Sequence, residues 1–133
     1  MGSLKIPPMV RRTVRFIYAL SAIVLVICIV LQVFIAGSAL FSNTGNWKIH
    51  ADFVSYFEFI PLGMFLLSFI AKINGKLRWI SLGMYLLILL QYMTIHVFSG
   101  MGNIIALHPV FALILFWGGI HLVKNSYPWL TAK

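Results

Sequence analysis

Four long apolar runs dominate the sequence, and short polar segments separate them. The runs span about residues 14–41, 48–72, 77–99 and 104–124. At a rise of about 1.5 Å per residue, about 20 helical residues cross the roughly 30 Å of hydrocarbon in a bilayer. Because backbone groups in lipid must be hydrogen-bonded within their own segment, helices are the expected form. The pattern predicts an all-α integral membrane protein with four spans.

The connections between the runs are short and rich in turn-forming residues, and they read SNTGN, KINGK and SGMGN. Short connections make consecutive helices antiparallel neighbours. We therefore expect a single domain, residues 1–133, folded as an up-down-up-down four-helix bundle. The small residues AGSA near the end of the first run would also suit a signal-peptide cleavage site. However, the run is longer than the usual apolar stretch of about 7–15 residues, which favours a retained anchor.

Basic residues mark one side of the predicted membrane protein. Four lie before or at the start of the first run, three lie where the second run ends and the third begins, and two lie at or after the end of the fourth: Lys5, Arg11, Arg12 and Arg15; Lys72, Lys76 and Arg78; Lys124 and Lys133. The other two connections carry only Lys48. Cytoplasmic connections of membrane proteins carry an excess of lysine and arginine. Both termini and the middle connection are therefore predicted to be cytoplasmic.

The composition strengthens the membrane prediction. Hydrophobic residues make up 62% of the chain and charged residues 9%, whereas soluble domains carry about 25% charged residues. The net charge of +8 would otherwise suggest nucleic-acid binding, but the basic residues lie at the ends of apolar runs, where membrane topology accounts for them. The expected partner is the lipid bilayer and no nucleic acid. The lone Cys28 cannot form an internal disulfide and is expected to be a small buried hydrophobe.

Three histidines are expected at one depth in the membrane. With this orientation His50, His96 and His108 lie near the outer ends of three different runs, within roughly 3–8 Å of the outer boundary. Ionisable side chains within a membrane usually have a function, and three at one level predict a shared site. The alternative is that interfacial water solvates each ring separately. His121, at the opposite end of the last run, is expected to be an interfacial residue.

Three other polar residues lie deeper. Glu58 is near mid-membrane, where a charged carboxylate is strongly disfavoured, so it is expected to be protonated or hydrogen-bonded. Gln32 and Gln91 are expected to form interhelical hydrogen bonds. Pro61 should kink the second helix near Glu58, because it leaves the Phe57 carbonyl without its usual donor.

The proline next to His108 leaves two local structures open. Pro109 either frees the carbonyl of Ile105 within a helix or begins the regular helix, with His108 in an irregular lead-in. Both alternatives fix the direction of the His108 ring, and the sequence does not choose between them.

Histidines without cysteines suit haem iron, copper or zinc. In a cyclic four-helix arrangement the second and fourth helices are diagonal, so His50 and His108 could ligate one b-type haem from opposite sides, with His96 as a further donor. Trp47 and Lys48 lie where haem propionates would reach the outer surface. Phenylalanines that could flank the haem ring occur at Phe53, Phe57, Phe98 and Phe111. No motif for covalent haem attachment is present in the sequence.

A three-histidine metal site is the competing prediction. His50, His96 and His108 would bind zinc or copper with water as the fourth ligand. Asp52 would then accept a hydrogen bond from one of the metal-binding rings. This site is smaller than a haem site and needs no slot between helices.

Three classes of function follow from these features. The first is haem binding for redox chemistry or haem handling, with a quinone or another redox protein as partner. The second is a small proton-coupled transporter, acting as a homodimer, in which Glu58 binds the proton. The third is a structural subunit of a larger membrane complex, whose helices approach closely at small residues: Gly37, Ser38, Gly63, Gly118 and Gly119. Asp52 and Glu58 are the only acids and the sequence has no catalytic triad or phosphate-binding loop, so no enzyme class is assigned.

Four stretches, FIAGSALF, IHADFVSY, LLQY and ALHPVFALILFWGGIHL, lie at the end of the first run, at the start of the second, in the third and in the fourth. Together they resemble a family of small prokaryotic four-span membrane proteins of unknown function, over about residues 16–124. The resemblance rests mainly on the histidine of the second run and on LHPV, and it implies His50 and His108 as family positions. It implies a prokaryotic plasma membrane but no activity. More loosely, histidines near helix ends are similar to those of the membrane cytochromes b, although this chain has fewer spans and no second histidine pair on the inner side.

Overall fold

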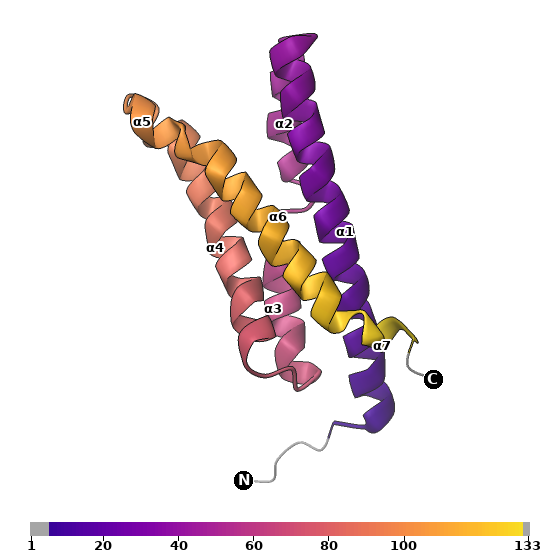
Figure 1. Cartoon of the computed structure of the whole chain (residues 1–133). Helices are drawn as coiled ribbons and strands as arrows, with labels where there is room; N and C mark the ends of the chain where they lie inside the picture. Colours follow the sequence, from indigo (N-terminus) through magenta and orange to yellow (C-terminus); the bar gives the residue numbers. More distant parts are fainter. Residues whose placement is uncertain (1–5, 132–133) are drawn as a thin grey trace.

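The computed structural model describes residues 6–131 of the chain. This part contains seven helices and no strand: α1 (Pro8–Phe41), α2 (Asn46–Val54), α3 (Ile60–Ile70), α4 (Lys76–His96), α5 (Gly102–Ile105), α6 (Leu107–Ser126) and α7 (Pro128–Thr131) (Figure 1).

Three helical segments are long and apolar enough to cross a membrane. They are α1, α4 and the stretch Gly102–Thr131, which holds α5 to α7. α3 is also apolar but has only 11 residues. Its length of about 16 Å is shorter than the roughly 30 Å hydrocarbon layer. The all-helical fold and these apolar helices agree with the prediction of a membrane protein.

The segment predicted as the second span, residues 48–72, was expected to be one kinked helix, but the structure divides it into two helices. α2 ends at Val54 and α3 begins at Ile60, with turns between them. Pro61, the second residue of α3, has no N–H to donate to the Phe57 carbonyl, which accepts instead from the backbone N–H of Ile60 at 3.0 Å. Proline is well tolerated in a first helical turn, so the helix restarts there instead of bending. Glu58 lies within this break.

The two alternatives at Pro109 are also resolved. α6 begins at Leu107, so Pro109 lies in its first turn, where a missing N–H removes no intrahelical hydrogen bond. His108 is already part of the regular helix, and the short α5 forms the lead-in. Pro109 therefore helps to start α6, but His108 does not lie in an irregular segment.

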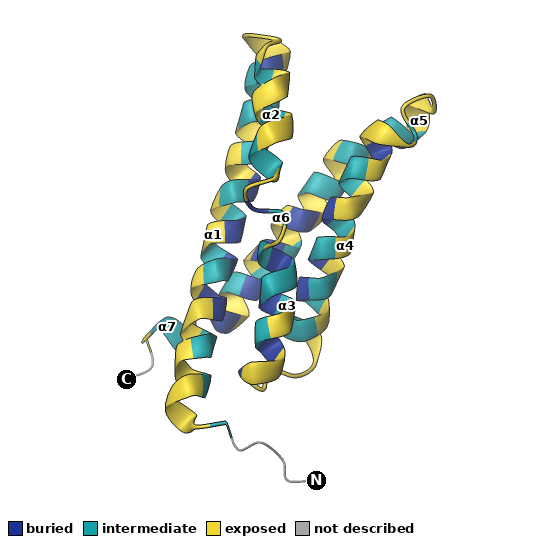
Figure 2. Ribbon diagram, turned by 180° about the vertical axis from the view of Figure 1, so that it is seen from behind, coloured by how far each residue is buried: buried dark blue, intermediate teal, exposed yellow. Residues whose placement is uncertain are grey.

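The chain runs alternately in opposite directions, so that its two ends lie at the same end of the molecule (Figure 1). This terminal end carries the start of α1, the connection between α3 and α4, and α7. Here α6 packs against α1 and α4, and α3 packs against the same two helices. At the opposite, open end, which carries Phe41 and α5, the helices diverge. Among the helices that the structure describes, the backbone of α2 approaches only α1 closely, whereas α5 stays with α4 and α6. Figure 2 shows the same divergence from behind.

The interior is small and the exterior is apolar. The fully buried large side chains come from every main helix except α2: Tyr18, Leu25, Met64, Ile88 and Leu122. On the outer faces, Phe34, Leu113 and Trp117 are 70%, 69% and 74% exposed, and exposed residues follow the outward side of each helix (Figure 2). A surface of this kind is stable against lipid and unfavourable in water.

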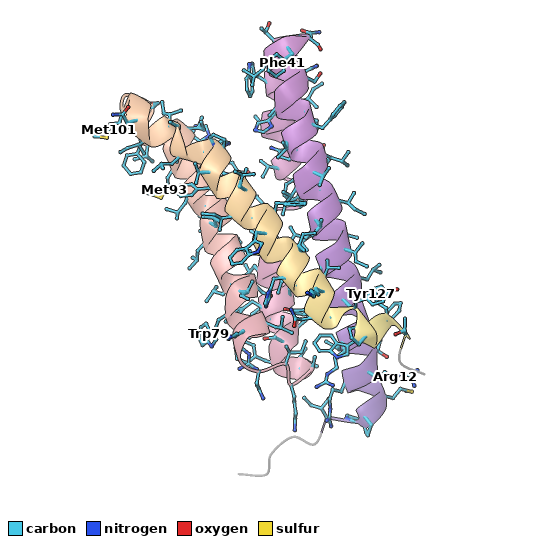
Figure 3. All side chains as sticks on the ribbon, in the orientation of Figure 1. Arg12, Phe41, Trp79, Met93, Met101 and Tyr127 are labelled. Atoms are coloured by element: carbon cyan, nitrogen blue, oxygen red, sulfur yellow. The ribbon has the colours of Figure 1, made fainter. Side chains whose placement is uncertain are left out.

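Aromatic and basic side chains mark the terminal end. Trp79, Tyr127 and Arg12 project near this end, while Phe41 and Met101 lie at the open end (Figure 3). In membrane proteins, aromatic and basic side chains of this kind reach the headgroup region of the bilayer.

A glycine allows α1 and α6 to approach closely. A Cβ atom at Gly119 would lie 2.8 Å from Cγ2 of Val26 on α1, a distance at which the Val26 side chain or one of the two helices must shift. At Gly37 and Gly63 a Cβ atom would meet no atom within 4 Å. Among these three small residues, Gly119 is therefore the one whose size the helix packing requires.

Candidate functional site

Two of the three predicted histidines come together near the start of α6. The ring centres of His50, from α2, and His108, from α6, are 6.3 Å apart, with an angle of 56° between the ring planes. Both residues are half-buried. Because α2 and α6 do not themselves pack together, these side chains span the space between two diverging parts of the molecule. The pairing of His50 with His108 is the one that the sequence favoured for a haem site.

The His50 ring is held by Gln32 of α1. Nδ1 of His50 lies 3.1 Å from the Gln32 carbonyl oxygen, and the Gln32 side-chain Nε2 donates to the His50 carbonyl at 2.7 Å. A carbonyl oxygen only accepts hydrogen bonds, so Nδ1 carries the proton of the neutral ring. Nε2 of His50 then presents a lone pair, which is the form in which imidazole binds metals.

The His108 ring is held by Thr94 of α4 in an analogous way. The Thr94 hydroxyl donates to the Gln91 carbonyl at 2.6 Å, and its oxygen lies 3.0 Å from Nδ1 of His108. A hydroxyl has one proton to donate. Because Thr94 uses that proton on Gln91, its oxygen accepts from Nδ1–H of His108, and Nε2 of His108 also presents a lone pair. A hydrogen bond at one ring nitrogen that orients the other is typical of metal-binding histidines.

The third predicted histidine does not join the pair. The ring of His96 is exposed and lies against Tyr92, with ring centres 6.2 Å apart and planes at 21°. His96 follows Thr94 by two residues, which is about 200° around the axis of α4, so the two side chains leave the helix on opposite sides. In the described part of the chain, no group of three His, Cys, Asp or Glu side chains could hold a metal ion. The structure therefore corrects the prediction of a three-histidine zinc or copper site.

Of the other site residues predicted near His50, one contacts its ring and two pair with each other. The Trp47 ring packs edge-on against His50, with ring centres 5.8 Å apart. Lys48 forms an exposed ion pair with Asp52, one turn further along the helix. Lys48 is about 200° around the helix axis from His50, so it lies on the far face of α2. Asp52 forms its ion pair with Lys48 and does not serve a histidine.

Glu58 has a hydrogen-bond donor, as its depth required. The Tyr92 hydroxyl of α4 donates to Oε2 of Glu58 at 2.6 Å, and both residues are half-buried. The bond joins the break between α2 and α3 to α4. A hydrogen bond of this kind lowers the cost of keeping a carboxyl group away from water.

We expect Tyr92→Phe to lower the free energy of unfolding by about 1–3 kcal/mol, because Glu58 would lose its donor while remaining partly buried. Chemical denaturation in detergent micelles, followed by far-UV circular dichroism, would measure this. Tyr56→Phe is a matched control, since Tyr56 is 81% exposed. Equal stability of the two variants would contradict a stabilising bond to Glu58.

Two buried glutamine side-chain oxygens lack hydrogen-bond partners within the described residues. They are Oε1 of Gln32 and Oε1 of Gln91. Gln32 makes the interhelical hydrogen bond expected of it, through Nε2, whereas Gln91 contributes its backbone carbonyl to Thr94. Buried acceptors without partners often mark bound water or a ligand.

Sequence reasoning missed two residues of this site, Thr94 and Tyr92. Thr94 is buried and polar near the outer end of the third run, but threonine in a helix commonly bonds to its own backbone, so its presence alone predicts no partner. Tyr92 looks like an interfacial aromatic residue in the sequence. The roles of both depend on which helix lies opposite, and no local pattern carries that information.

Residues 32–100, just over half of the chain, match the sequence model of DUF6220, a family of unknown function. The chain therefore belongs to this family, which confirms the resemblance to an uncharacterised family. The matched segment includes His50 and Glu58 and ends before His108. Comparisons with curated proteins and with solved structures found no match.

Proposed function

We propose that this member of the DUF6220 family binds one b-type haem between His50 and His108, and that the haem serves electron transfer or haem handling. The proposal includes a four-span arrangement in a prokaryotic cell membrane, with α2 and α3 together forming the second span. Both termini are then cytoplasmic, because the basic residues gather at the terminal end. The histidine pair lies toward the extracytoplasmic face.

The number of available ligands carries this proposal. A zinc site needs three or four protein ligands, and the described residues bring together two histidines with no third metal-binding side chain. Haem supplies the equatorial nitrogens itself and takes only axial ligands from the protein. Two imidazoles on different helices are therefore sufficient for haem and insufficient for zinc.

The spacing of the two rings is compatible with axial ligation. Bonds from imidazole nitrogen to a metal are about 2.0–2.1 Å long, so two imidazoles on opposite sides of one ion have ring centres roughly 6 Å apart. The observed separation is 6.3 Å. Gln32 and Thr94 engage Nδ1 of the two rings, which leaves both Nε2 atoms as the candidate ligands.

The surroundings also suit a flat apolar group. The ring of Phe53, in α2, packs against the ring of Phe57, in the segment between α2 and α3, with centres 5.5 Å apart. Among the described helices, the backbone of α2 approaches α1 closely but neither α4 nor α6, so a group held by both histidines would join the two diverging parts. The unpaired oxygens of Gln32 and Gln91 provide acceptors for water or for a polar edge of the ligand.

A haem in this position would exchange single electrons with a quinone in the bilayer or with a redox protein at the outer surface. The roles of the chain's own residues are to hold the iron through two imidazoles, to orient those rings through Gln32 and Thr94, and to restrict water with Trp47 and the neighbouring phenylalanines.

The optical spectrum of the purified protein tests the proposal. We expect the purified protein either to contain haem already or to take up one haem per chain on titration. In both cases its Soret band should shift when dithionite is added. Titration of a detergent-solubilised membrane protein without histidine pairs provides the control for haem partitioning into micelles. A colourless protein that binds no more haem than this control would refute haem binding.

A further inference from the structure

Glu58 is the only glutamate of the chain, and the proposed haem site does not use it. It lies in the break between α2 and α3, about midway along α1 (Figure 1). Its carboxyl oxygen Oε2 accepts a hydrogen bond from the Tyr92 hydroxyl of α4 at 2.6 Å. Like the histidine pair, this bond links the side of the molecule that carries α2 to a helix that diverges from it.

On the α4 side, Glu58 is held close to the residue that orients His108. Tyr92 precedes Thr94 by two residues, or about 3 Å along the axis of α4. Thr94 is the residue whose hydroxyl oxygen lies 3.0 Å from Nδ1 of His108. Two residues turn a helix by about 200°, so the Tyr92 and Thr94 side chains leave α4 on opposite sides. Glu58 and His108 therefore flank α4 at nearly the same depth.

On the α2 side, two aromatic rings lie between Glu58 and His50 along the chain. Phe57, the residue before Glu58, is buried and packs against Phe53, with ring centres 5.5 Å apart. Phe53 follows His50 by three residues, which is less than one turn of α2. Charges separated by apolar side chains interact more strongly than charges separated by water. A change in charge at the histidine pair therefore acts on the carboxyl group of Glu58.

The contacts of Glu58 allow both the ionised and the protonated form of its carboxyl group. Glu58 forms no ion pair with any residue that the structure describes, so no cation holds it in the ionised form. The Tyr92 hydroxyl donates to Oε2, and it can do so whether or not Oε1 carries a proton. Negative charge added near a half-buried carboxylate disfavours its ionised form. A proton on Oε1 removes that cost.

The elements around Glu58 carry few other titratable groups away from the terminal end. Besides the histidine pair, they are Cys28 of α1; Lys48 and Asp52 of α2; Tyr56 of the break; and Tyr85, Tyr92 and His96 of α4. α3 has none. Asp52 is paired with Lys48 at the surface, and Tyr85 packs against Phe59. His96 stacks on Tyr92 and is exposed, which brings the Glu58–Tyr92 pair within about one helix turn of water at the outer end of α4.

We propose that Glu58 binds a proton when the haem is reduced and releases it when the haem is oxidised, with Tyr92 as a positioning residue. This inference rests on the proposed haem site. One electron passes to the iron from a reductant, such as a quinol in the bilayer, and one proton passes from water at the outer face to Oε1 of Glu58. The reduced protein then carries no additional net charge within the membrane, where an uncompensated charge is costly. Tyr92 holds Oε2 in both states.

The midpoint potential of the haem-loaded, full-length protein, measured over about pH 4–8, tests the coupling. This range includes the titration of an ordinary glutamate, at about 4.3. Proton binding on reduction makes the potential fall as the pH rises, by up to about 59 mV for each tenfold change in proton concentration. Glu58→Gln should remove most of this slope. Asp52→Asn, which removes the other acid of the chain, should keep it. A potential independent of pH in the parent, or equal slopes in the parent and in Glu58→Gln, would overturn the proposal.

A measurement on the haem-free protein separates the proton site from haem binding. Because the chain has a single glutamate, isotopically labelled glutamate gives one carboxyl band in the infrared spectrum of the full-length protein. This band should change from the ionised to the protonated form as the pH is lowered from about 8 to about 4. Tyr92→Phe should shift the band, whereas Tyr56→Phe should not, since Tyr56 does not contact Glu58 through a hydrogen bond. The measurement needs no substitution of Glu58, so it remains decisive even if Glu58→Gln fails to fold.

The same labelled band, followed in the haem-loaded protein, completes the test. Reduction with dithionite at constant pH should increase the protonated form of Glu58. Bound haem whose reduction leaves the band unchanged would refute the coupling alone. A band that responds to pH in a protein that binds no haem would refute the haem site and the coupling with it. A band that stays in one form at every pH would refute proton binding by Glu58.

Discussion

Leucine in place of His108 should abolish the haem spectrum of the purified protein, and leucine in place of His50 should do the same. Each change removes one of two axial ligands, and losing even an outer hydrogen-bond partner of a metal ligand typically costs about 10–100-fold in affinity. We therefore expect haem affinity to fall by more than roughly 100-fold. Absorbance titration with haem, before and after dithionite, measures the loss.

His96→Leu is the matched control for this experiment. His96 is exposed and packs on Tyr92, away from the pair, so its replacement should leave the spectrum unchanged. Thr94→Val is a more sensitive test, because it keeps both histidines but removes the acceptor of Nδ1–H of His108. It should weaken haem binding by about 10–100-fold, and Thr94→Ser should restore it. Loss of the spectrum in His96→Leu, or its full retention in His108→Leu, would be incompatible with the proposed ligation.

Gly119→Ala should have the second large effect, on stability. The added Cβ atom would lie 2.8 Å from the Val26 side chain and 3.7 Å from the Met84 side chain, so either Val26 would leave its packed position or α1 and α6 would separate. Inserting a carbon into a closely packed interior usually costs about 1–3 kcal/mol. Denaturation in detergent micelles, followed by circular dichroism, would show a lower free energy of unfolding.

Gly63→Ala distinguishes this effect from a general effect of alanine in these helices. No atom lies within 4 Å of the position that a Cβ would occupy at Gly63. Alanine favours helix formation relative to glycine by about 1 kcal/mol, so Gly63→Ala should be neutral or stabilising. If both variants have the same stability as the parent, close approach at Gly119 does not contribute to the fold.

The sequence predicted the class of fold because that prediction depends on local properties. Apolar runs of about 20 residues between short polar connections require helices in lipid, and the computed structure has three helices long enough to span a membrane. It did not predict the break between α2 and α3. Pro61 is compatible with a kink in one helix or with the start of another. The structure has the second arrangement, in which α2 packs along α1 and a new helix starts near Pro61.

Part of the site was also predicted, namely the part that depends on distance along the chain. The pairing of His50 with His108 was foreseen from depth and helix order, and the structure brings these rings together. His96 was placed at the correct end of α4 but not on the correct side of it. Its direction depends on how α4 is rotated against α3 and α6, and the apolar pattern of α4 is too uniform around the helix to specify that rotation.

The sequence by itself determined that this is a helical membrane protein, which of its ends carries the basic residues, and which polar groups lie within the apolar runs. These properties follow from composition and from distance along the chain. Only the tertiary structure decided that His96 lies apart from the other two imidazoles, that Thr94 and Gln32 orient His108 and His50, and that Arg11 and Trp129 share one pocket. The physical reason is that a contact between helices depends on their rotation, tilt and separation, which arise from packing over many residues, such as Gly119 against Val26, and are encoded in no single segment.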